Sequence, residues 1–131
     1  MSEYQAGECN IGEAEQRRRY ALGGVASVAT LVLITWVLAT DGPMWVLGFS
    51  VIPLFGAAEG FFQGRFEFCP LFASLGIYDV STEGDDRREV PSEADRRADA
   101  RQAWRIHAYS AALAVVLTLI LYVVAYLAHI D

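Results

Sequence analysis

Two cysteines and one histidine are the side chains of this sequence best suited to chemistry. Cys9 and Cys69 are too few for a disulfide framework, and both are expected on one side of a membrane hairpin. There they could approach each other, bind a metal with His107, or carry sulfur. However, Cys69 opens an apolar run, where a free cysteine usually behaves as a small buried hydrophobic residue. A structural role is therefore favoured, with thiol chemistry as the alternative; a zinc site has the weakest support, because no closely spaced ligand pair exists.

Glu59 is the only acidic residue inside the apolar stretches of the chain. A carboxyl group in a membrane span is costly, and it indicates a functional site by default. Glu59 is expected near the inner headgroups, one turn from Gln63 and close to the arginines of the interface, Arg65 and Arg105. We therefore predict an intramembrane polar site of Glu59, Gln63, Arg65 and His107, in which the carboxylate pairs with an arginine. A proton or ion site is the alternative.

Three apolar stretches must position these side chains. Residues 20–40 carry no charge, and at about 1.5 Å per residue they are about 31 Å long, enough to cross a bilayer core. After a tight turn, a second stretch runs from Met44 to about Phe62, and Pro53 should kink it. The third stretch covers residues 106–130. The predicted fold class is an all-α integral membrane protein that begins with an antiparallel transmembrane hairpin.

The arginines predict an orientation for these spans. All ten basic residues of the chain are arginines, and each either precedes the first stretch or lies between the second and the third. Short loops rich in Arg or Lys remain in the cytoplasm. The expected location is the cell membrane, with several passes, a cytoplasmic N-terminus and an extracellular C-terminus.

The segments before and after the hairpin predict smaller elements. Residues 1–10 should form a polar tail, with Asn10 capping a helix that starts at Ile11. The apolar run 69–78 is too short to span a bilayer and predicts a short helix lying at the membrane surface. Residues 11–78 would thus form the hairpin plus an interfacial helix.

The last part of the chain predicts one long helix. Residues 79–92 should form a charged cytoplasmic loop that ends at Ser92, a helix-capping residue. Residues 93–131 then read as a continuous helix that contains the third span, with an ion pair between Glu93 and Arg97 in its first turns. Because the chain is short, all these parts belong to a single domain.

Small residues in the first span predict a helix-packing face. Gly23, Gly24 and Ser27 lie within about one turn of one another. Such residues allow close helix approach in lipid. This face could support self-association into a homo-oligomer or packing within a larger membrane complex.

Composition narrows the classes of partner. The 131 residues include sixteen acidic ones, no lysine, and 54% hydrophobic residues, with a net charge of −6. An acidic chain is unsuited to binding nucleic acid, which requires a basic face, so the lipid bilayer is the expected surrounding. Abundant acid without lysine is similar to the composition of halophilic proteins, and a haloarchaeal source is expected by that analogy.

Asn10-Ile11-Gly12 and Arg17 to Arg19 precede the first span, and Cys69-Pro70-Leu71-Phe72 and Leu75-Gly76-Ile77 follow the second. These two groups of residues resemble the YgaP-like transmembrane domain, which occurs alone or fused to a rhodanese domain. The resemblance covers about residues 9–78 and implies a short helical hairpin. Phe72 stands where the family usually has Tyr, and a third span is added. The chain is also similar to small haloarchaeal membrane proteins of unknown function. No rhodanese domain is present, so the resemblance implies no sulfurtransferase activity.

Three functions remain open from the sequence. The first is a non-catalytic scaffold or accessory subunit that acts through helix packing and its cytoplasmic face. The second is a membrane-anchored protein that handles thiols or sulfur through Cys69, with or without Cys9. The third is an oligomeric transporter or channel subunit that uses Glu59. No nucleophile, base and oxyanion donor can be assembled from the sequence, so we expect neither an enzyme nor a bound cofactor.

Overall fold

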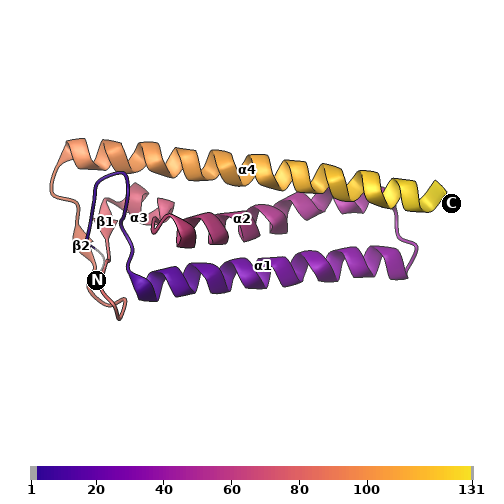
Figure 1. The fold of residues 1–131 in the computed structure, drawn as a ribbon, viewed down its shortest axis with the longest axis horizontal. Coiled ribbons are helices and arrows are strands. Elements are labelled where there is room, and N and C mark those ends of the chain that lie inside the picture. Colours follow the sequence, from indigo (N-terminus) through magenta and orange to yellow (C-terminus); the bar gives the residue numbers. More distant parts are fainter. Residues whose placement is uncertain (1–2, 131) are drawn as a thin grey trace.

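The computed structural model describes residues 3–130 and consists of three long helices that meet a small polar region at one end (Figure 1). In chain order its elements are α1 (Glu13–Ala39), the 3-10 helix η1 (Met44–Ser50), α2 (Val51–Arg65), α3 (Pro70–Leu75), β1 (Ile77–Tyr78), β2 (Arg88–Glu89) and α4 (Glu93–Ile130). The helices α1, α2 and α4 lie side by side (Figure 1). The helix α3 and both strands gather where α4 begins, and α4 ends at the opposite end of the molecule.

Within the described residues, three helical segments are long and apolar enough to cross a membrane: Glu13–Ala39, Met44–Arg65 and Glu93–Ala128. Their outward sides carry large exposed apolar side chains, such as Val25 and Leu119. Water-soluble monomers rarely expose apolar surface of this extent. The molecule therefore fits a multi-pass membrane protein, as the sequence predicts.

Glycines set the distance between α1 and α2. A Cβ atom added to Gly60 would lie 2.6 Å from the Cα and N atoms of Gly23, and one added to Gly64 would lie 2.7 Å from the Tyr20 ring. Gly56, Gly60 and Gly64 are spaced four residues apart, so they share one face of α2. This face lets the backbones of two helices touch, the arrangement that small residues permit in membranes.

The second span does not start as the regular α-helix that the sequence predicts. Its first part, Met44–Ser50, is the 3-10 helix η1, and the α-helix begins only at Val51. Pro53 has no N–H to donate to the carbonyl of residue 49. The change of helix type falls just before it, so Pro53 stands in the first turn of α2, where the missing donor costs least.

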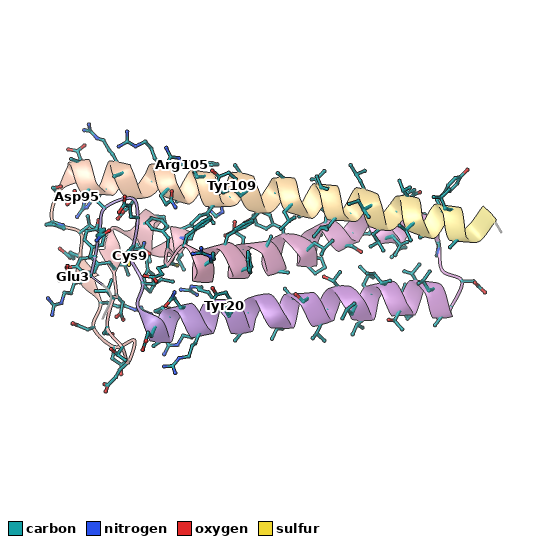
Figure 2. All side chains as sticks on the ribbon, in the orientation of Figure 1. Glu3, Cys9, Tyr20, Asp95, Arg105 and Tyr109 are labelled. Atoms are coloured by element: carbon teal, nitrogen blue, oxygen red, sulfur yellow. The ribbon has the colours of Figure 1, made fainter. Side chains whose placement is uncertain are left out.

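We call residues 4–12 and 66–92 the cap. Figure 2 shows Cys9 within this polar end of the molecule. Its first segment is not the polar tail that the sequence predicts, because it forms backbone hydrogen bonds across the cap. The N–H of Asn10 donates to the carbonyl of Glu67 at 3.0 Å, and Ile11 is fully buried in a parallel bridge with Asp79.

The apolar run 69–78 forms only a six-residue helix, α3. It ends at Gly76, whose φ of 68° is left-handed and suits glycine. The chain then enters β1, which pairs antiparallel with β2 so that Ile77 faces Glu89. The predicted interfacial helix is therefore shorter than expected, and part of the predicted loop is a strand.

The long last helix agrees with its sequence prediction. The helix α4 has 38 residues and begins at Glu93. The N–H of Asp95 donates to the Ser92 hydroxyl at 3.1 Å, and Arg97 pairs with Glu93 at 2.8 Å. Local capping and i, i+4 spacing predict these contacts because both partners lie within one turn.

Candidate functional site

Asn10 joins the N-terminal segment to the start of α3. Its side-chain Oδ1 accepts a hydrogen bond from the N–H of Cys69 at 2.6 Å, and its Nδ2 donates to the Cys69 carbonyl at 3.0 Å. Asn10 is fully buried, and its own N–H donates to the Glu67 carbonyl. The prediction that Asn10 caps the first helix is wrong: α1 begins at Glu13 with Gly12 as its N-cap. The Asn10 side-chain amide instead forms hydrogen bonds with the backbone of Cys69, which is distant in the sequence.

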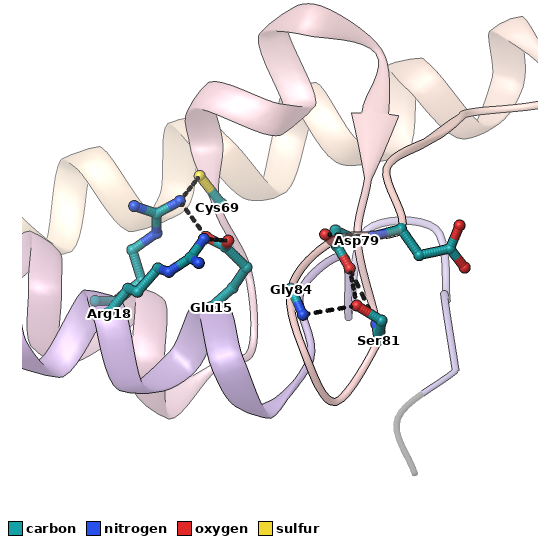
Figure 3. Close-up of polar contacts among 8 residues, drawn as sticks. Glu15, Arg18, Cys69, Asp79, Ser81 and Gly84 are labelled. Carbon is teal, nitrogen blue, oxygen red and sulfur yellow. Dashed lines mark hydrogen bonds and ion pairs between the residues drawn. The ribbon is translucent and has the colours of Figure 1, made fainter.

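The thiol of Cys69 lies against a buried ion pair (Figure 3). Arg19 Nη2 lies 3.2 Å from Cys69 Sγ and 3.1 Å from Glu15 Oε2. Glu15 is only 2% exposed and also pairs with Arg18. The Arg19 guanidinium further covers the ring of Phe72, with Cζ 5.7 Å from the ring centre. Cys69, at 1% exposure, is thus enclosed by cationic and aromatic groups.

Cys9 has a different environment. Its Sγ lies 3.6 Å from the Ile11 carbonyl oxygen and 3.5 Å from Glu67 Oε2, so its one proton can be donated to either oxygen. Burial and, secondly, the hydrogen bond to Glu67 raise the pKa of the Cys9 thiol to about 11. Cys9 is therefore a protonated donor at neutral pH, the opposite of an activated thiol.

The structure does not bring His107 to either cysteine. Cys9 and Cys69 are both free and buried, and the sulfurs have different polar neighbours, Glu67 for Cys9 and Arg19 for Cys69. His107 contacts Glu59 rather than either sulfur. Within residues 3–128, no group of three metal-ligating side chains is found. The predicted metal alternative thus lacks a ligand set in the described part of the chain.

Glu59 forms a polar cluster between α2 and α4. Its Oε1 lies 2.7 Å from His107 Nδ1, and its Oε2 accepts from Gln63 Nε2 at 2.7 Å. The Glu59 side chain is 11% exposed, and that of His107 is 42% exposed. The ring of Phe55 stacks near His107, with centroids 6.4 Å apart. The predicted grouping of Glu59, Gln63 and His107 is present.

The predicted arginine partner of Glu59 is absent. Arg65 is exposed, and neither it nor Arg105 makes an ion pair with Glu59 in the part of the chain that the structure describes. Helix geometry explains this, since side chains three or four residues apart share a face. Arg65 lies six residues after Glu59, and Arg105 lies two residues before His107, so both point away from the contact between α2 and α4.

The small residues of α1 have three different positions. Gly23 is buried against α2, with its hypothetical Cβ 3.2 Å from the Ala57 carbonyl. Gly24 is exposed and has no atom within 4 Å of such a Cβ. Ser27 donates its hydroxyl to the Gly23 carbonyl at 2.8 Å. Gly23 therefore serves a contact within the chain, and the predicted packing face is not available as a whole to a second copy.

A buried carboxylate closes the loop between β1 and β2 (Figure 3). Asp79 Oδ1 accepts from the N–H and the hydroxyl of Ser81, at 3.1 and 2.6 Å, and Oδ2 accepts from the N–H of Asp86 at 3.2 Å. The Ser81 hydroxyl in turn accepts from the N–H of Gly84. Asp79 is fully buried, and sequence reasoning missed it. An Asp two residues before a Ser at a turn is a weak local signal for this arrangement.

A second missed carboxylate attaches the N-terminal segment to α4. Asp99 is fully buried; it accepts from the Tyr4 hydroxyl at 2.9 Å and from the N–H of Gly7 at 2.7 Å. The Tyr4 ring stacks on Tyr78, with centroids 4.2 Å apart. Burial and the Asp99 carboxylate raise the pKa of Tyr4 well above its usual value. Asp99 looks like an ordinary solvated helix residue in the sequence, so nothing local predicts its role.

No family model, curated protein or solved structure matches this chain. The resemblance to the YgaP-like domain therefore remains a prediction from the sequence.

Proposed function

We propose that the protein is a non-catalytic membrane module, a scaffold or accessory subunit that acts through its packed helices and its cap. In this proposal α1 and the segment Met44–Arg65 form a transmembrane hairpin, and α4 makes the third pass. The cap lies in the cytoplasm, because the arginines lie in it or on the helix ends beside it, and the C-terminus lies outside.

One observation supports this proposal most strongly: the chemically capable groups of the cap and of the first turns of α4 are used for internal contacts. Cys69 contacts Arg19, and Cys9 donates to Glu67. Asp79 and Asp99 accept hydrogen bonds from backbone N–H groups. Buried polar groups satisfied in this way rigidify a fold and leave little capacity for turnover.

The experiment is to purify the protein at its natural level from its own membranes in a mild detergent and to measure the mass of its assembly by light scattering. We expect an assembly larger than one chain, and we expect a Cys9→Ser/Cys69→Ser variant to retain it. A single chain in every mild detergent, or loss of the assembly in a well-folded cysteine-free variant, would contradict the proposal.

A second candidate function, the handling of thiols or sulfur, is favoured by the contact between Arg19 and Cys69. A cationic group beside a sulfur is typical of reactive cysteines. However, Glu15 neutralises Arg19, and the sulfur is 1% exposed, so a reagent reaches it only if the cap opens.

This candidate can be tested by intact-mass measurement of the protein purified without reductant, together with maleimide labelling under native conditions. The scaffold proposal predicts two free thiols of unmodified mass that label slowly. One extra sulfur on Cys69, or rapid labelling of Cys69 in the folded protein, would place the thiol function first.

A further inference from the structure

One face of α4 carries two apolar hollows, the first beside the cap and the second farther along the helix. The first, about 240 Å³, is lined by Pro70 and Ser74 from α3 and by Ala100, Ala103, Trp104 and His107 from α4. The second, about 290 Å³, is lined by Val51, Ile52 and Phe55 and by Ala111, Ala114 and Val115 of α4. The α4 residues of both sets recur every three or four positions, so they share one face of the helix. Most of these α4 residues are alanines, and their short side chains leave the space that forms the hollows.

The end of this face nearest the cap is cationic. Arg101 stands one turn before Trp104 and Arg97 one turn before Arg101, so the three side chains form one row beside the first hollow. Arg101 is exposed and makes no ion pair with any residue that the structure describes. Among the residues that the structure describes, Arg97 pairs only with Glu93, and both of these side chains are more than 70% exposed, so solvent or another anion competes easily.

Trp104 marks the depth of the first hollow. Its side chain is 75% exposed, although it is the largest apolar group in this part of α4. Tryptophan prefers the boundary between headgroups and hydrocarbon. The arginines therefore lie at the level of the headgroups, and His107 and the second hollow lie progressively deeper.

We propose that this face binds one anionic phospholipid, whose phosphate contacts Arg101 and Arg97 and whose acyl chain lies along the hollows past Trp104 and His107. From Ala100 to Val115 the face extends about 22 Å at about 1.5 Å per residue, which suits a headgroup plus the half-thickness of about 15 Å of one leaflet. Cationic groups at one end and an apolar lining at the other match the two ends of such a lipid. The inference goes beyond the proposed scaffold function and requires only that α4 is in the membrane.

The test is quenching of Trp104 fluorescence by lipids brominated on the acyl chain, with the full-length protein in nanodiscs. Trp36→Phe and Trp45→Phe changes make Trp104 the only reporter. We expect brominated phosphatidylglycerol to quench at about fivefold lower mole fraction than brominated phosphatidylcholine, since one unpaired arginine near a headgroup contributes about that factor and Arg97 is already paired with Glu93. Arg101→Gln should remove most of the preference. Arg17→Gln is the matched control, because it removes an exposed arginine of α1 and should leave the preference intact.

Equal quenching by the two lipids would overturn the proposal, and so would a preference that Arg101→Gln leaves unchanged. Protection of Trp104 from both lipids would also overturn it and would indicate that a second copy or another helix covers the face. A thermal melt of each variant checks folding, and because Arg101 is exposed, we expect the melting temperature to remain unchanged.

Discussion

Asn10 shows how much of the cap depends on a single buried side chain. Its amide satisfies both the N–H and the carbonyl of Cys69, and water does not reach this point because both residues are buried. A buried backbone group without a partner costs more than an ordinary hydrogen bond contributes. The asparagine is therefore a structural determinant of the position of Cys69.

Replacing Asn10 with Ala should destabilise the protein by about 2–3 kcal/mol, since two buried backbone groups lose their partner. Thermal unfolding in detergent, followed by circular dichroism, measures the effect. Ser74→Ala is the control, because the exposed Ser74 hydroxyl donates only to the Leu71 carbonyl within its own helix. Equal stability of the two variants would mean that the Asn10 bridge contributes little.

The Cys9 thiol should make the free energy of unfolding depend on pH in the alkaline range. Its pKa is raised from 9.0 to about 11 in the folded protein, so the unfolded chain loses this proton first. The stabilising contribution of Cys9 is fully present below pH 9 and is lost as the pH rises from about 9 to about 11. Unfolding curves across this range should fall more steeply for the natural protein than for Cys9→Ala. The Tyr4 hydroxyl is present in both proteins, so its contribution cancels in the comparison. Parallel stability curves for the natural protein and Cys9→Ala would contradict the prediction.

At the scale of elements, the contact between α1 and α2 depends on the absence of side chains. Gly60→Ala would place a methyl group 2.6 Å from the backbone of Gly23, so the helices must separate. We expect a loss of about 1–3 kcal/mol, the usual cost of overpacking. Gly24→Ala is the matched control, since its methyl group would meet no atom within 4 Å, and it should be neutral or slightly stabilising. Unfolding by SDS in mixed micelles gives both values, and a reversed order would mean that α1 and α2 pack through another face.

The contact between α2 and α4 contains a polar pair that can be measured directly. We expect a double-mutant cycle with Glu59→Gln and His107→Gln to give a coupling free energy of about 1–2 kcal/mol in detergent unfolding. The same cycle with Arg65→Gln in place of the histidine change should give no coupling. A larger coupling to Arg65 would restore the arginine partner that the sequence suggests and would contradict the helix geometry described above.

The elements were predictable from the sequence to different degrees, for physical reasons. The limits of α4 follow from Ser92 and from a long uncharged run, since capping is local and lipid demands uninterrupted apolar helix. The approach of Gly60 to Gly23 follows from the spacing of Gly56, Gly60 and Gly64, a signal that sequence reasoning overlooked. The cap was not predictable, because pairs such as Asn10 with Cys69, or Tyr4 with Asp99, join residues that no local pattern connects.

For the molecule as a whole, eight of the ten arginines fall into two groups; the other two are Arg87, whose guanidinium lies over the Phe72 ring, and Arg96, whose side chain lies beside Gly76. Arg18, Arg19, Arg88 and Arg97 form ion pairs with nearby acidic residues. Arg17, Arg65, Arg101 and Arg105 are exposed and form none with the residues that the structure describes. Two hydrogen bonds align the ends of the three helices: Gln16 donates to the Gly64 carbonyl, and Glu59 contacts His107. The arginines of the second group therefore lie at about the same height along the helix bundle. Anionic lipids of a cytoplasmic leaflet would attract such a layer of unpaired arginines and hold these helix ends at the membrane surface.

This charge layer leads to a prediction of topology. In a Cys9→Ser/Cys69→Ser background, single cysteines at Thr40, in the turn between the first two spans, and at Thr82, in the cap, give exposed reporters on opposite ends of the molecule. We expect a membrane-impermeant maleimide to label Thr40→Cys on intact cells and Thr82→Cys only after lysis, because arginine-rich segments stay in the cytoplasm. The reverse pattern would place the cap outside. It would then remove the arginines from the anionic leaflet that the proposed lipid site needs, while leaving the packing of the three helices untouched.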